Sequence, residues 1–354
     1  MLRLLLTRLL RLLPVTWGIV SVFFLLSRAL PDDQLLARAI ESQLDTGSRA
    51  ITAPQRQALE LQLRRRLGLD KPVFYFSIQR SATGGQSHWR WHGLRNQYHL
   101  WWLDVVRGEL GRSYRDNKPV ASLLIETLRF TLPFTAAAAF LAIGAALWLS
   151  LWMTRHSRWR SYLLTILYSL DALPLFVVAL VLLYLLANPD MLALFPVYGF
   201  DNPEPTDTWL ANVGSYLHHL ALPVFSLVLI TLPGLVTQLD ASLQHELQTA
   251  YAVTARAKGL AFRQVVRHHT LRNALLPVVA LVTDLLPAMV AGAVVVEVIF
   301  ALPGMGRLLA DAAAARDYPV LQGSVLLIAS VRLLSHIVAD GLYWQLDPRL
   351  RSQL

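Results

Sequence analysis

Six long apolar segments constrain the fold of this chain more than any other feature of its sequence. A helix that crosses the hydrocarbon core of a bilayer needs about 20 apolar residues, because each residue advances the helix by about 1.5 Å. Six segments meet this requirement: Leu9–Leu30, Thr131–Met153, Leu163–Leu186, Leu220–Leu239, Leu275–Ile299 and Val320–Trp344. Charged residues make up only 16% of the chain, whereas soluble domains carry about 25%. We therefore predict an all-α polytopic membrane protein with six transmembrane helices.

The first segment also allows another interpretation. Its uninterrupted apolar run, residues 12–27, is short, and Ser27-Arg28-Ala29 resembles the small-x-small site at which signal peptides are cleaved. Arg8 and Arg11 lie about one helical turn apart and would hold the start of a helix at the cytoplasmic surface. We favour a membrane helix, with a cleaved signal peptide as the alternative.

The charges of the connecting loops predict the orientation of the helices. Residues 188–219 contain four acids and no Lys or Arg, whereas residues 154–162 contain three Arg and residues 255–274 contain five bases, both without an acid. Because short cytoplasmic loops carry an excess of Lys and Arg, the two basic loops and both chain termini should be cytoplasmic. Long loops cross the membrane largely regardless of their charge, so the basic residues 31–125 can still lie outside.

This topology divides the chain into four parts. Residues 1–30 form an N-terminal transmembrane helix, and residues 31–125 form an extracytoplasmic segment. Residues 126–345 form a five-helix core with a cytoplasmic loop at 240–274, and residues 346–354 form a cytoplasmic tail. The net charge of +9 is then an orientation signal facing the anionic lipid bilayer, not a surface for nucleic acid.

Several kinds of chemistry lack their residues in this chain. A phosphate-binding P-loop ends in Gly-Lys-Ser/Thr, but Lys71 and Lys118 precede Pro and Lys258 precedes Gly. The chain has no Cys, which excludes a disulfide scaffold and a thiolate metal site. Ser324 and His336 share one predicted helix but lie about 18 Å apart, too far for a catalytic hydrogen bond. We expect no catalytic residue, metal or cofactor.

The loop between the fourth and fifth spans carries the most informative pattern. Residues 251–259 predict a short helix that ends at Gly259. Small side chains would let this helix lie closely in the groove of another protein: Ala252, Ala255 and Ala257. Arg256 and Lys258 could then reach acids on that partner. By pattern alone, an ordinary positive-inside loop is equally consistent.

Specific motifs favour the first interpretation. The stretch Thr254-Ala-Arg-Ala-Lys-Gly-Leu260 resembles the "EAA" loop of ABC-importer permeases, in the form found in the oligopeptide/dipeptide/nickel importer family. Further blocks resemble the same family, in order along nearly the whole chain: Leu67–Pro72, Gly108–Tyr114, Pro174–Phe176, Val294–Leu309, Arg316–Gly323 and Leu346–Arg351.

The resemblance implies a transmembrane subunit of the type I ABC-importer permease class, with an extracytoplasmic insertion between helices 1 and 2, in the bacterial cytoplasmic (inner) membrane. Such a subunit pairs with a second homologous permease and forms half of a pathway for peptides or similar small solutes. Two cytoplasmic ATPases bind below it, and an extracytoplasmic substrate-binding protein docks above. The resemblance assigns ATPase coupling to seven residues: Tyr251, Thr254, Ala255, Arg256, Ala257, Lys258 and Gly259.

The chain departs from the family pattern at several charged positions. Asp240 stands where the family usually has Arg, and residues 250–254 lack two charges that the family often has there. Three charges fall inside predicted spans, at positions that are usually uncharged in the family: Asp171, Asp284 and Arg332. Counted at about 1.5 Å per residue, all three lie roughly 12–14 Å from the cytoplasmic edge of the membrane.

We predict that Arg332 pairs with Asp284 or with Asp171, which leaves one acid over. The pair either fixes the packing of the helices, or the surplus acid faces the pathway and attracts a cationic group of the substrate. The same charges suit a secondary, ion-coupled transporter, which is the alternative function. Co-purification discriminates between the two, since a permease should bring down an ATPase through residues 251–259.

Overall fold

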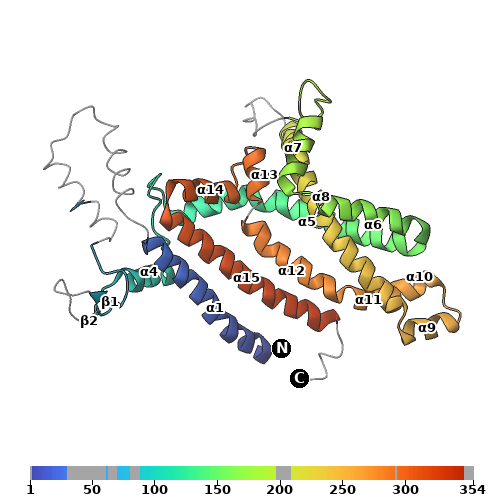
Figure 1. The fold of residues 1–354 in the computed structure, drawn as a ribbon, viewed down its shortest axis with the longest axis horizontal. Helices are drawn as coiled ribbons and strands as arrows, with labels where there is room; N and C mark the ends of the chain where they lie inside the picture. Colours follow the sequence, from blue (N-terminus) through green and yellow to red (C-terminus); the bar gives the residue numbers. More distant parts are fainter. Residues whose placement is uncertain are drawn as a thin grey trace. The chain divides into compact units, whose positions relative to one another are not determined.

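The computed structural model describes residues 2–29, 61–62, 70–79, 88–196, 209–291 and 293–346. The described chain is dominated by helices (Figure 1). Its elements are α1 (Leu2–Ala29), β1 (Phe76–Gln79), β2 (His88–Trp91), α4 (Gln97–Val106), α5 (Val120–Arg155), α6 (Ser157–Asp171), α7 (Leu175–Leu186), α8 (Trp209–Leu247), α9 (Ala250–Ala257), α10 (Phe262–Gln264), the π-helical η1 (Val265–Thr270), α11 (Leu271–Ala274), α12 (Leu276–Ala291), α13 (Val294–Ile299), α14 (Met305–Ala315) and α15 (Tyr318–Leu346).

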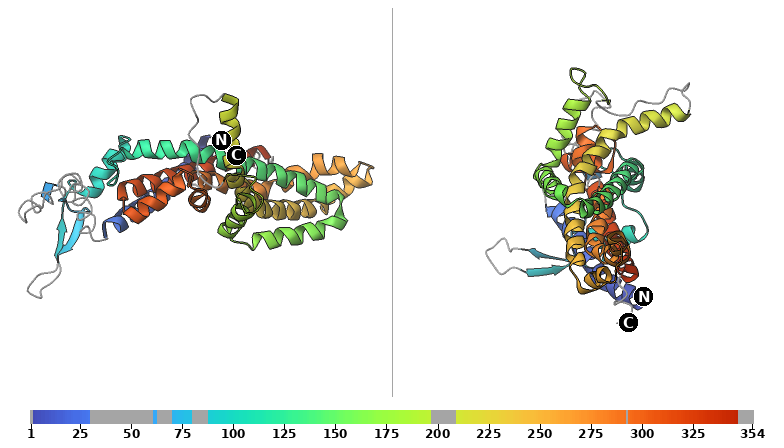
Figure 2. Two further views of the ribbon diagram at one scale, coloured as in Figure 1. Left: turned by 90° about the horizontal axis from the view of Figure 1, so that it is seen from above. Right: turned by 90° about the vertical axis from the view of Figure 1, so that its right-hand side faces the viewer.

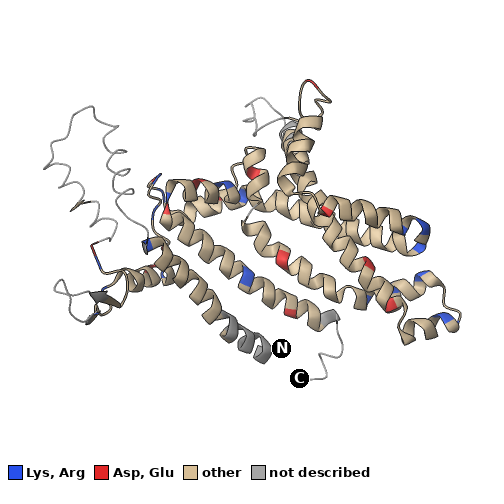
Figure 3. Ribbon diagram, viewed as in Figure 1, with Lys and Arg blue, Asp and Glu red and all other residues tan. Residues whose placement is uncertain are grey.

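Among the described residues, four helical stretches are long and apolar enough to cross a membrane: Val120–Arg155, Val213–Leu247, Leu276–Ile299 (α12 and α13) and Tyr318–Trp344. They contain the second, fourth, fifth and sixth predicted spans, whose existence is therefore confirmed. Charged residues are sparse along them, and the few on α12 and α15 stand out in Figure 3. The first predicted span corresponds to a shorter apolar helix, Leu13–Arg28 within α1, so the total of six spans stays a prediction.

The third predicted span is not one straight helix. Residues 163–186 belong to α6 and α7, which meet at a bend of 99°. Pro174 sits at the N-cap of α7 with an extended backbone (φ −61°, ψ 142°). A proline lacks the N–H of the helical ladder and keeps the residue before it out of the helical region, so α6 ends before it. The single straight span that the sequence predicts over Leu163–Leu186 is therefore two helices joined at a bend.

The chain divides into two compact units, and α8 is the central helix of the larger one, which comprises Met1–Leu12, Glu126–Ala310 and Ile328–Leu354. In this unit α8 packs against α6, α7 and α12 (Figure 1). One apolar cluster includes Met153, Val236, Leu239 and Leu243, all almost fully buried. A second cluster joins α7 and α8 to α5 and to α13 through buried apolar side chains, among them Phe134 and Val296.

The smaller unit comprises Leu13–Ile125 and Asp311–Leu327. Aromatic rings hold its parts together: Phe24 of α1 meets Tyr98 edge-on with ring centroids 5.5 Å apart, and the Tyr98 hydroxyl lies 2.7 Å from that of Ser21. β1 and β2 form an antiparallel hairpin, seen in Figure 2, with Phe76 opposite Trp91. This hairpin lies in the predicted extracytoplasmic segment and is an addition to the all-α prediction.

Candidate coupling loop and membrane charges

The predicted coupling segment folds as a short helix between two tight turns. Two residues separate the end of α8 from the start of α9, and the second of them, Thr249, is extended at the N-cap of α9. Gly259 follows the helix with a φ of +83°, a left-handed conformation that suits glycine because it has no Cβ. The chain then returns through α10 and η1 to α11 and α12. The sequence prediction of a short helix followed by a turn at Gly259 is confirmed.

The inner face of α9 packs on its own chain. Ala252 is fully buried and Ala255 nearly so, and both form one apolar cluster with Val265 of η1. Within this chain the small size of both residues serves the close approach of α9 to η1, and the coupling role of Ala255 stays a prediction. Ala257 is exposed, in agreement with the expectation.

Two polar links tie α9 to the neighbouring helices. The Arg256 guanidinium donates a hydrogen bond of 2.7 Å to the carbonyl of Leu247, the last residue of α8. The Tyr251 hydroxyl bonds to the Glu246 carboxylate and accepts a hydrogen bond of 3.1 Å from Asn273 of α11. Partial burial raises the pKa of the Tyr251 phenol above its ordinary value, and the nearby carboxylate raises it further. Because its guanidinium bonds to the Leu247 carbonyl, the Arg256 side chain points back to its own chain.

The outer surface of the loop contains both predicted and unpredicted residues. Tyr251, Thr254, Ala257, Lys258 and Gly259 are exposed, as the coupling prediction requires. The sequence missed three exposed apolar side chains beside them: Val253, Leu260 and Phe262. The signal that could have identified them is the occurrence of apolar residues in a basic loop at positions that do not face the rest of the chain. Together these residues form an exposed surface of mixed apolar and basic character.

Asp240 forms the best-made ion pair among the described residues. The Arg160 guanidinium of α6 donates hydrogen bonds to both carboxylate oxygens. Its Nε lies 3.1 Å from Oδ1 and 2.9 Å from Oδ2, and its Nη2 lies 2.7 Å from Oδ2. The Asp240 side chain is only 2% exposed. An unpaired carboxylate in that position would be strongly destabilising. The departure at Asp240 thus links α8 to the start of α6.

Glu297 gathers one of the matching sequence blocks around its carboxylate. Its side chain is fully buried and accepts hydrogen bonds from Thr131 Oγ1 (2.8 Å) and from the Arg307 backbone N–H (2.9 Å). A Cβ on Gly304 would lie 2.3 Å from the Glu297 carboxyl carbon, so only glycine fits there. The Val294–Leu309 block is therefore a folded turn built on one acid.

Asp317 plays a similar part in the smaller unit. Its carboxylate accepts hydrogen bonds from the Ser113 hydroxyl (2.5 Å) and from the backbone N–H groups of Tyr114 (3.0 Å) and Arg115 (3.4 Å). Two blocks about 200 residues apart in the sequence, Gly108–Tyr114 and Arg316–Gly323, thus meet at one carboxylate.

The structure separates the three predicted membrane charges. Arg332 of α15 pairs with Asp284 of α12, with 3.5 Å between Nη2 and Oδ1. Asp171 is the last residue of α6, at the bend, and is exposed; within the described part of the chain it forms no ion pair. The role of all three charges stays a prediction.

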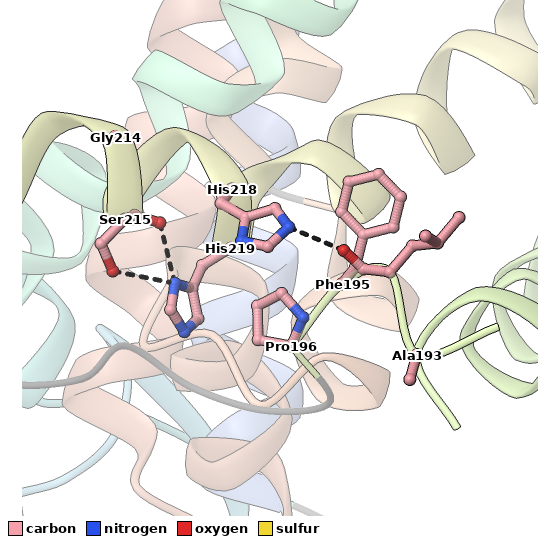
Figure 4. A pocket seen from close by; sticks show the side chains of 8 residues that line it. Ala193, Phe195, Pro196, Gly214, Ser215, His218 and His219 are labelled. Atoms are coloured by element: carbon pink, nitrogen blue, oxygen red, sulfur yellow. Dashed lines mark hydrogen bonds between the residues drawn. The ribbon is translucent and has the colours of Figure 1, made fainter. Parts of the chain in front are cut away.

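A pocket of about 630 Å³ lies at the junction of α8 and the segment after α7. Figure 4 shows that its two adjacent histidines turn to different partners. His218 Nε2 lies 2.8 Å from the Leu194 carbonyl, and His219 Nδ1 lies 2.8 Å from the Ser215 carbonyl. Each bonded nitrogen therefore donates its proton to a carbonyl. Among the described residues, no group of three or more His, Cys, Asp or Glu side chains could hold a metal ion.

Residues 127–352 match the model of one protein family, described as binding-protein-dependent transport system inner membrane component. The chain belongs to this family. The matched residues include α9, Glu297, Asp317 and the Arg332–Asp284 pair. The prediction of a mostly helical inner-membrane permease subunit of the type I importer class is confirmed, while the orientation of its termini stays a prediction.

Relatives of this permease extend the likeness to the whole chain. The dipeptide transport system permease protein DppB of Haemophilus influenzae is 36% identical over 269 residues, which cover 70% of this chain and 78% of the relative. The DppB protein of Escherichia coli K12 is 30% identical over 100% of both chains. The glutathione transport system permease protein GsiC of Escherichia coli O6:H1 is 30% identical over 99% of both.

Proposed function

We propose that this permease forms half of the translocation pathway of an ATP-driven importer for small peptides. The dipeptide and glutathione systems named for its relatives support this substrate class. A second homologous permease completes the pathway, two cytoplasmic ATPases hydrolyse ATP, and a substrate-binding protein delivers peptide from outside. Both termini then face the cytoplasm.

The observation that carries the coupling role is the two-faced character of α9. Its inner face is fixed to η1 by Ala252 and Ala255, and its outer face presents Tyr251, Val253 and Ala257. A helix that is fixed on one side and exposes apolar and basic groups on the other suits docking into an ATPase. No other chain is needed to hold α9 in place, so the surface exists before the ATPase binds.

Cysteine labelling tests the docking, and the chain helps because it has no native Cys. Ala257→Cys should react with a membrane-impermeant thiol reagent from the cytoplasmic side only, and the ATPases should protect it. Ala252→Cys, on the same helix but fully buried, is the matched control and should stay unlabelled. Labelling of Ala257→Cys from the outside would refute the proposed orientation, and labelling unaffected by the ATPases would refute the docking.

Uptake tests the transport function itself. In proteoliposomes that contain the second permease, the ATPases and the binding protein, a radiolabelled dipeptide should be transported only when ATP is present on the side of the membrane that carries the ATPases. Ala257→Trp places a bulky group on the exposed face and should uncouple ATP hydrolysis from uptake. Accumulation driven by an ion gradient without nucleotide would instead support the ion-coupled alternative.

A further inference from the structure

The Arg332–Asp284 pair differs in kind from the structural ion pair elsewhere in this chain. Arg160 and Asp240 make a two-pronged contact, and the Asp240 side chain is 2% exposed. Arg332 and Asp284 share a single contact of 3.5 Å, and their side chains are 58% and 59% exposed. An ion pair that served only to hold two helices together would have a short contact and a buried partner, as Arg160–Asp240 does.

The position of the pair makes this exposure unusual. Asp284 lies eight residues into α12, roughly 12 Å from its start, and Arg332 lies about 21 Å from either end of α15. Both helices belong to candidate membrane spans. Charged groups at such depth face protein or a water-filled cavity, not lipid. The face of α12 and α15 that bears the pair is therefore turned to an aqueous space or to protein.

The surroundings of the pair leave room for a ligand. The exposed positions of α12 fall on one stripe at helical spacing, with small residues on both sides of Asp284: Ala280 and Ala288. Within the described part of the chain, neither the Arg332 nor the Asp284 side chain forms a hydrogen bond in addition to the ion pair. A guanidinium has five N–H donors and a carboxylate about four acceptor sites, so most of this capacity is unused.

We infer that Arg332 and Asp284 line the translocation pathway and contact the charged ends of a zwitterionic peptide as it passes. The inference rests on the proposed function, because it takes the peptide substrate from there. The guanidinium matches the fork geometry of a terminal carboxylate, and the Asp284 carboxylate accepts hydrogen bonds from a terminal ammonium group.

The loose pair suits a site that must bind and release. The two termini of an extended dipeptide lie about 7 Å apart, so the partners separate to receive them. One ion pair is broken and two are formed, but both charged ends of the peptide lose their water on binding. This desolvation and the broken pair offset the two new contacts, so the peptide is accepted without being trapped, which a transit site requires.

Removing both charges distinguishes this role from a structural one. The double variant Arg332→Met with Asp284→Leu replaces the pair by apolar side chains, which a purely structural pair tolerates well. We expect peptide uptake to fall about tenfold or more, while the complex assembles and the liganded binding protein still stimulates ATP hydrolysis. Uptake equal to wild type would overturn the inference but not the proposed function. Failure of the wild-type complex to import peptide would overturn both.

Single variants test the ligand chemistry. Asp284→Asn should shift the ratio of Ala-Glu to Ala-Lys uptake upward, and Arg332→Gln should shift it downward, each by about tenfold, because one charge of the site remains. The binding protein is unchanged, so its own preference cancels between variants. A ratio that stays constant in both variants would overturn the inference, since a packing role does not select peptides by charge.

Thiol labelling tests whether the face is wet. Ala288→Cys, on the exposed stripe, should react with an impermeant thiol reagent, and a saturating dipeptide should slow the reaction. Val290→Cys, nearly buried on the same helix, is the control and should not react. No reaction at Ala288→Cys, or its cross-linking to the second permease with no effect of peptide, would overturn the assignment of this face to the pathway.

Discussion

The space beside Glu297 gives a sharp test of how the Val294–Leu309 turn is built. A Cβ on Gly304 would lie 2.3 Å from the carboxyl carbon and 2.4 and 2.5 Å from the two oxygens of Glu297. Ordinary contacts are 3.4 Å or longer, so the carboxylate would have to move by about 1 Å or more. Thr131 and the Arg307 N–H hold it in place, so this movement breaks at least one buried hydrogen bond.

These contacts set the expected magnitude. Overpacking costs about 1–3 kcal/mol, and a lost hydrogen bond to a charged group costs about 1.5–3 kcal/mol. Gly304→Ala should therefore destabilise the permease by about 2.5 kcal/mol or more, since the two costs add. Glu297→Ala should also destabilise it, because it leaves buried donors on Thr131 and Arg307 without an acceptor. In the Glu297→Ala background the obstacle is gone, and Gly304→Ala should cost less than about 1 kcal/mol.

A double-mutant cycle measures this coupling. Reversible unfolding in mixed detergent micelles, followed by tryptophan fluorescence, would give the free energy of unfolding of the four proteins. The single costs should exceed the cost of the double variant by about 3 kcal/mol. Strictly additive costs would refute the steric argument, because they would mean that a methyl group at position 304 does not meet the carboxylate.

Three further outcomes follow from the contacts of the described residues. Arg160→Gln should lower the unfolding free energy by about 3 kcal/mol because it strands the buried Asp240, whereas the double variant with Asp240→Asn should recover most of it in the same unfolding assay. Asp317→Ala should increase proteolysis around Ser113, measured by peptide mapping, because the turn loses its three acceptor contacts. The pKa of Tyr251 is raised in the folded state, so its protonated phenol stabilises the fold at pH values below the ordinary phenol pKa. This stabilisation is lost as the pH rises through the pKa of the folded state. Tyr251→Phe should therefore flatten the alkaline fall in stability of the permease, and an unchanged slope would contradict this.

Much of the membrane architecture follows from the sequence, because apolar length alone marks a span. The exceptions have local causes. Pro174 occurs in a run of apolar residues that hydropathy cannot divide, and only its backbone geometry produces the 99° bend. The strands β1 and β2 are four residues each, too short for their alternation to be distinguished from loop.

The candidate site was predictable in part for a similar reason. The position of α9 and its end at Gly259 are local features, and the sequence predicts them. Ala252 and Ala255 face Val265 of η1, a separate helix that follows the turn, so the pattern of α9 alone does not predict which way these alanines point. Residue counting gave Arg332 and Asp284 a similar depth but not their positions around the helix axes, so the choice between two acids needed the structure.

The tethers of α9 have a mechanical consequence. Arg256 fastens the loop to the last carbonyl of α8, and Tyr251 fastens it to Asn273 just before α12. A load applied to the outer surface of α9 is thus divided between two long helices instead of bending one. Arg256 is not among the residues of the outer face, so cutting its tether would loosen α9 while leaving intact the surface proposed to meet the ATPase.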